Sequence, residues 1–147
     1  MSWLRTEPAG VADELQKIHI QLRALRLQLE DQADRAPYTF ITERLQKLGA
    51  NEERSSLAVA ARLAALGRHA DETDADTLVD GRNCWERLVR LQDGYRDLIR
   101  QLKPLSVRWE DEHPEDAQLL ASVRDTAVAS RTIVGDLVAR SDPHALD

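Results

Sequence analysis

The sequence predicts an all-α fold, an antiparallel up-down four-helix bundle formed by a single domain over residues 1–147. The first observation behind this prediction is composition: only six Gly and five Pro occur, and aromatic residues make up 4% of the chain. The remainder is rich in Ala, Leu, Arg and Glu, which favour helices over sheets. The second is that apolar residues recur at alternating steps of three and four along most of the chain. The third is that Pro, Gly and Asn divide these periodic segments into four arms of similar length.

The first arm is expected over residues 8–35, after a loose lead-in over residues 1–7. Pro8 suits the first helical turn, and Pro37 disfavours helix at the residue before it. The apolar seam keeps a coiled-coil-like spacing: Val11, Leu15, Ile18, Leu22, Leu25 and Leu29. A second apolar stripe, made of Ile20, Ala24 and Leu27, falls on the opposite side. A single buried seam would leave this stripe in water, so either the first arm is covered on both sides within one chain or the stripe is an interface.

The second arm is expected over residues 38–67 and carries Phe40 or Ile41, Leu45 and Leu48 inward. Beyond residue 51 its apolar face is expected to resume with Leu57, Ala60, Ala61, Leu63, Ala64 and Leu66. Gly49 is typical of a helix end and Asn51 of a new helix start, so the arm is predicted to kink between them. Gly67 is the predicted end of the arm. Because Asp71 offers a cap for the next helix, the connection between the second and third arms is predicted to be a short turn.

The third arm, expected over residues 72–103, has the widest apolar face and is placed at the centre of the bundle. Its inward rows contain Cys84, Trp85, Leu88, Leu91, Tyr95, Leu98, Ile99 and Leu102. Asn83 and Gln92 are polar positions in this arc, and such residues set the register of packed helices. Pro104 opposes continuation of the helix, so a short extra helix bearing Trp109 is predicted before the fourth arm.

The fourth arm is expected over residues 114–140, with Pro114 in its first turn and acidic residues behind it. Its inward face is expected to contain Leu120, Val123, Ala127, Val134, Leu137 and Val138. Many of its other positions are Ala, Ser or Thr, which allow close approach of a neighbouring helix. The tail over residues 141–147 is expected to be loose.

Charge and cysteine content exclude several classes of function. The net charge of −6 disfavours nucleic acid and anionic membranes as partners. No window is apolar enough for a membrane span or a signal peptide, so a cytoplasmic protein is expected. The lone Cys84 cannot form an intramolecular disulfide and is expected to be buried. No nucleophile elbow or phosphate-binding loop is present, so neither enzymatic activity nor a bound cofactor is predicted.

A ferritin-like di-iron centre needs carboxylates from four helices and two inward Glu-x-x-His pairs. One such spacing occurs, from Glu110 to His113, in a charged segment directly before Pro114. No second copy exists, and the short connection expected after Gly67 differs from the long crossover of ferritin-like folds. No metal site is therefore predicted.

These observations predict a non-catalytic helical interaction protein: a scaffold, adaptor or accessory subunit that binds a protein partner. It is expected to form homo-oligomers through the stripe of Ile20, Ala24 and Leu27. The alternative is a ferritin-like or sensor-like bundle that binds a metal or a small molecule between its helices. Its candidate pocket would lie around His19, Trp85, Tyr95 and Trp109.

Overall fold

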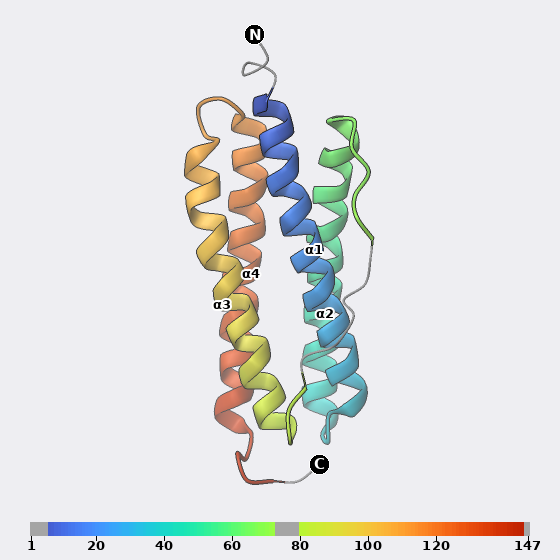
Figure 1. Ribbon diagram of the computed structural model, residues 1–147. Helices are drawn as coiled ribbons and strands as arrows, with labels where there is room; N and C mark the ends of the chain where they lie inside the picture. The colour runs from blue at the N-terminus through green and yellow to red at the C-terminus, as the bar shows by residue number, and fades with distance from the viewer. Residues whose placement is uncertain (1–5, 73–79, 146–147) are drawn as a thin grey trace.

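The computed structural model describes residues 6–72 and 80–145, and this part of the chain is a four-helix bundle without strands (Figure 1). The helices are α1 (Thr6–Arg35), α2 (Thr39–Ala65), α3 (Cys84–Arg108) and α4 (Pro114–Arg140). α1 packs mainly against α2, and α3 mainly against α4, with fewer contacts between the two pairs. The predicted all-α four-helix bundle is confirmed.

The order of helix directions differs from the predicted up-down-up-down arrangement. α1 and α2 are antiparallel, as are α3 and α4, but α2 and α3 run in the same direction (Figure 1). Residues 66–83 therefore join the end of α2 to the start of α3 at the opposite end of the bundle. The prediction of a short turn between Gly67 and Asp71 is wrong.

The third helix begins at Cys84 instead of residue 72, because Asn83 is its N-cap. The Asn83 side-chain oxygen accepts a hydrogen bond from the Glu86 backbone N–H at 2.8 Å. Asn83 is therefore a capping residue and does not set the register of the core as predicted. Residues 73–79 of the predicted arm lie outside the described residues.

Two predicted interruptions are absent from the described helices. α2 is continuous through Gly49 and Asn51, so the predicted kink is not seen. α3 continues through Pro104 to Arg108, so the predicted extra helix is the last turn of α3. Pro104 is exposed and lies close to the end of α3. The helix therefore tolerates this proline, although it removes one backbone hydrogen bond.

Gly67 does end the second arm, as predicted. Its φ of 80° lies in the left-handed region that glycine adopts without steric cost. The Arg68 N–H bonds to the Leu63 carbonyl at 2.9 Å, and the Gly67 N–H bonds to the Ala64 carbonyl at 3.0 Å. These two bonds form a Schellman cap, which turns the chain back toward α1.

The core follows the predicted seam of α1, most of the predicted rows of α3 and the first half of α2. In the second half of α2 the predicted apolar face is wrong: Leu57 is 62% exposed, Ala61 and Ala64 are exposed, and the buried seam runs through Val59 and Leu63. The seam residues of α1 from Val11 to Leu29 are all buried, and so are the predicted inward residues of α4 except Val138, which is half-buried. Beyond Arg140, the Asn83 side-chain amide donates to the Pro143 carbonyl at 2.8 Å, which ties part of the predicted loose tail to the start of α3. Residues 1–5 and 146–147 lie outside the described residues. Among the described helices, none is both long and apolar enough to cross a membrane.

Candidate functional site

A buried polar cluster lies at the middle of the bundle and is formed by Glu52 of α2, Tyr95 of α3 and Ser130 of α4. Each of the three side chains is at most 1% exposed. The Tyr95 hydroxyl donates to Glu52 Oε1 at 3.0 Å, and the Ser130 hydroxyl donates to the same oxygen at 3.2 Å. Glu52 Oε2 is buried and has no hydrogen-bond partner in the described part of the chain. One carboxyl group thus connects three helices through one of its two oxygens.

The electrostatics of this cluster follow from its burial. Removal from water raises the pKa of the Glu52 carboxyl, and the hydrogen bonds from Tyr95 and Ser130 only partly oppose this effect. Burial and the nearby Glu52 raise the pKa of the Tyr95 hydroxyl far above its ordinary value. The raised pKa favours the protonated carboxylic acid, which costs less to bury than a carboxylate.

The sequence carried a signal for Glu52 that the prediction did not use. Glu52 continues the apolar seam of α2, which runs through Ile41, Leu45, Leu48, Glu52, Ser56, Val59 and Leu63. Its neighbour Asn51 was interpreted as a helix start, which placed Glu52 in an exposed first turn. Helical spacing across the supposed kink would have placed it in the core.

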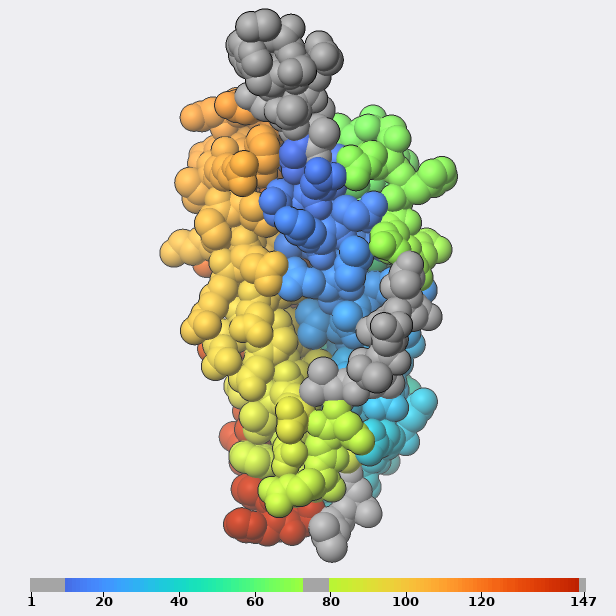
Figure 2. All heavy atoms as spheres, in the orientation of Figure 1, coloured from blue at the N-terminus to red at the C-terminus, as the bar shows by residue number. Residues whose placement is uncertain are grey.

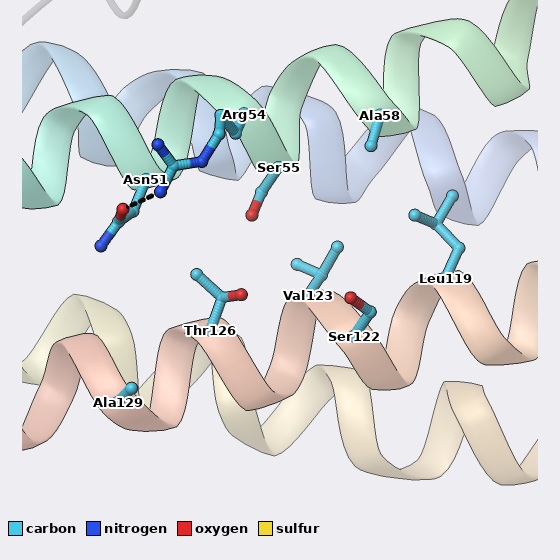
Figure 3. A pocket seen from close by; sticks show the side chains of 9 residues that line it. All are labelled: Asn51, Arg54, Ser55, Ala58, Leu119, Ser122, Val123, Thr126 and Ala129. Atoms are coloured by element: carbon cyan, nitrogen blue, oxygen red, sulfur yellow. Dashed lines mark hydrogen bonds between the residues drawn. The ribbon is translucent and has the colours of Figure 1, made fainter.

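A groove of about 400 Å³ lies between α2 and α4, at the level of the polar cluster but on the outer side of the two helices (Figure 3). Its walls are mostly short side chains: Asn51, Ser55 and Ala58 from α2, and Ser122, Val123, Thr126 and Ala129 from α4, with Leu119 at one end. Arg54 is the charged residue of this lining and is hydrogen bonded to the Asn51 side chain. Asn51 and Ala129 directly adjoin Glu52 and Ser130 in the sequence.

The structure does not bring the four predicted pocket residues together. Tyr95 belongs to the central cluster, whereas His19 is buried on α1 near Asp71. Trp85 is half-buried and lines a separate hollow of about 140 Å³ beside Tyr38 and Cys84.

Trp109 lies at the opposite end of the bundle from Trp85. Its ring is the nearest neighbour of Gly10, where an added Cβ would meet it at 3.4 Å. It also makes an edge contact with His113, with ring centroids 5.3 Å apart. Trp109, which is 5% exposed, therefore packs beside Gly10 at this end of the core.

The predicted interface stripe lies on the outer side of α1. Ile20 is 40% exposed, while Ala24 and Leu27 are half-buried. The structure contains one chain, so an interface at these residues stays a prediction.

A buried ion pair joins the end of α2 to the start of α4. Asp116 is 0% exposed and is held by the Arg62 guanidinium, which contacts both of its carboxylate oxygens, one of them at 3.3 Å. Arg62 also lies 3.3 Å from a carboxylate oxygen of Glu115, and His113 Nδ1 lies 3.8 Å from Asp116. Hydrogen bonding to Asp116 raises the pKa of Arg62. These groups pair with one another, and we assign them a structural role.

The donor set does not fit a di-iron centre held by one chain. Such a centre needs several inward carboxylates and two Glu-x-x-His pairs. Among the described residues, no group of three or more His, Cys, Asp and Glu side chains could hold a metal ion. Glu110 is exposed and His113 faces Trp109 and Asp116, so their sequence spacing forms no inward pair. At the middle of the bundle, Glu52 is accompanied by two hydroxyl groups.

The fold resembles that of ferritin-like four-helix bundles, in which two antiparallel helix pairs are joined by a long crossover. Mycobacterium smegmatis Dps1, solved as a mutant, matches with a TM-score of 0.77 at 20% identity, over 89% of this chain and 96% of that chain. Antigen TpF1 from Treponema pallidum also matches with a TM-score of 0.77, at 14% identity over 89% and 92% of the two chains. No protein-family model matches the sequence, and neither does any curated protein.

These matches contradict the predicted non-catalytic scaffold and favour the alternative, a ferritin-like bundle. The error has a structural cause. The prediction ranked the ferritin-like bundle second because the connection after Gly67 was taken as short, whereas α2 ends and α3 begins at opposite ends of the bundle. The predicted absence of catalysis is not tested by the fold and stays a prediction.

Proposed function

We propose that this chain is a ferritin-like bundle that binds a small polar molecule between α2 and α4, in place of a di-iron centre. The groove between these helices carries the proposal. It has about 400 Å³ of space, and its lining combines three hydroxyl groups, one amide and one guanidinium. A volume of this size suits a small organic molecule.

The chemistry of the lining favours a ligand that carries a carboxylate or a phosphate group. Arg54 supplies a permanent positive charge, and no acidic residue lines the groove. The hydroxyl groups of Ser55, Ser122 and Thr126 can donate to anionic oxygens. Because the walls are short side chains, a ligand can approach both helix backbones closely.

The first test is titration with inorganic phosphate and with citrate, followed by amide NMR shifts. We expect saturable shifts at groove residues such as Ser55 and Thr126. Arg54→Ala is expected to weaken binding at least tenfold, because a charged hydrogen bond of about 1.5 kcal/mol or more is lost. Ser122→Trp, which fills the groove, should also block binding. Arg131→Ala is the matched control, since Arg131 is an exposed arginine of α4 outside the groove.

Unsaturable shifts, or equal effects of the Arg54 and Arg131 substitutions, would show that the groove binds no such ligand. Elemental analysis of protein purified without added metal tests the competing function. Stoichiometric iron, manganese or zinc would contradict the proposal, because it would show a metal centre instead.

We also propose that copies of the chain associate with one another, independently of ligand binding in the groove. Ile20 is 40% exposed and forms one apolar stripe with Ala24 and Leu27 on α1. If copies of the chain pair through this stripe, the double variant Ile20→Glu, Leu27→Glu should lower the mass measured by light scattering while the helical circular dichroism signal is retained. Leu57→Glu is the control, because Leu57 is a 62% exposed apolar residue on α2. An unchanged mass in the double variant would remove the stripe as an interface.

A further inference from the structure

The first part of the crossover is held against α1 by a set of polar contacts. We name residues 66–72 the strap; they follow α2 and lie beside α1 in the surface view (Figure 2). The Gln16 side-chain amide donates to the His69 carbonyl at 2.7 Å and accepts from the Asp71 N–H at 2.6 Å. Arg68 pairs with Asp13 at 2.8 Å. Leu66 and Ala70 of the strap also pack against the core.

His19 lies one helical turn after Gln16 on α1 and is 3% exposed. Its imidazole is hydrogen bonded to the backbone of Asp71 in the strap. The second ring nitrogen, Nδ1, is buried and has no hydrogen-bond partner among the residues that the structure describes. A protonated imidazole has two N–H donors, so protonation would leave one of them unsatisfied in the buried position.

We propose that the strap is a pH-sensitive element in which protonation of His19 releases residues 66–72 from α1. The buried position holds the neutral imidazole well, whereas the imidazolium needs water at Nδ1. Water can reach His19 when the strap moves away, because the strap supplies the Asp71 contact. The release therefore couples the protonation of one side chain to a local opening of the crossover.

The charged groups around His19 have opposing effects on the pKa of its imidazole. Arg23 on α1 disfavours the imidazolium, while Asp71 and Glu72 on the strap favour it. Burial has the largest effect and lowers the pKa of His19 below its ordinary value of 6.5. The pKa of His19 is consequently lower in the closed strap than in the open one, so the open strap binds the proton more tightly. Acid below pH 6.5 favours opening.

The test is the hydrogen-exchange protection factor of the Asp71 amide, measured at pH 7.5 and pH 5.5. Because the pKa of His19 is lower in the closed strap than in the open one, the opening equilibrium is expected to increase from pH 7.5 to pH 5.5, by up to about tenfold for an imidazole with the ordinary value once open. Val134, a buried residue of α4, reports global unfolding, and its protection should not fall in parallel. Parallel loss at both amides would overturn the proposal.

Two glutamine variants separate His19 from other histidines. His19→Gln removes the titrating group, so the Asp71 protection factor should become independent of pH, whatever its absolute value. His69→Gln is the matched control, because His69 lies in the strap itself but is exposed. It should retain the pH-dependent change. The proposal fails if His19→Gln keeps the pH dependence or if His69→Gln abolishes it.

Discussion

Replacement of Arg62 by alanine is expected to lower the free energy of unfolding by about 3 kcal/mol. The substitution leaves the Asp116 carboxylate, which is 0% exposed, without its guanidinium partner. Loss of one member of a buried pair is costly because the remaining charge is desolvated and unpaired. For a chain of this length the melting temperature should fall by about 10 °C. Chemical and thermal denaturation measure both quantities.

Two further variants test the cause of this loss. In Arg62→Ala, Asp116→Asn the buried charge is absent, so part of the stability should return. Arg140→Ala is the control: Arg140 and its partner Asp136 are both exposed, 3.4 Å apart on α4, and such pairs contribute little. Equal losses in Arg62→Ala and Arg140→Ala would show that burial of Asp116 has no special effect.

The sequence predicted the helices well because most of their stability comes from packing of a periodic apolar face. The α1 seam from Val11 to Leu29 is fully specified by its spacing, and the structure buries each member. The helix end at Gly67 was also predictable, since a left-handed residue favours glycine. Local patterns of this kind do not depend on the rest of the fold.

The connection between the helix pairs was harder to predict, because several residues before Cys84 also offer helix caps. The decisive signal was Asn83 followed by Glu86, which together begin α3. Gly81 supports that start, because a Cβ at this position would come within 3.0 Å of the Arg87 backbone nitrogen. Nothing local distinguishes this cap from the earlier candidate at Asp71, which instead bonds to Gln16.

The candidate site depended on contacts between residues far apart in the sequence. Glu52 and Ser130 are separated by 78 positions and meet only in the packed bundle. The groove between α2 and α4 likewise depends on which helices become neighbours. An up-down-up-down order and the observed crossover order place different helices side by side, so the predicted pocket joined residues that lie apart.

Glu52→Gln is expected to remove a pH dependence of stability that the unmodified chain shows above about pH 4.5. Burial raises the pKa of Glu52 in the folded chain above its ordinary value of 4.5. The Glu52 carboxyl contributes its full stabilisation below pH 4.5, where it is protonated in both the folded and the unfolded chain. As the pH rises toward the folded-state pKa, the unfolded chain loses this proton first, and stability falls by up to about 1.4 kcal/mol per pH unit.

The glutamine side chain keeps a carbonyl acceptor for Tyr95 and Ser130 and carries no charge, so this loss should disappear in Glu52→Gln. The difference in unfolding free energy between the two proteins, measured by denaturation from pH 4.5 to 8, isolates Glu52 from His19, because His19 titrates in both. Glu53→Gln is the control, since the Glu53 side chain is 56% exposed. Parallel pH profiles for the unmodified chain and Glu52→Gln would contradict a protonated carboxyl at the centre of the bundle. If the unfolding free energy of Glu52→Gln increasingly exceeds that of the unmodified chain as the pH rises, the core excludes the carboxylate. The buried Oε2, which has no partner among the described residues, leads us to expect this result.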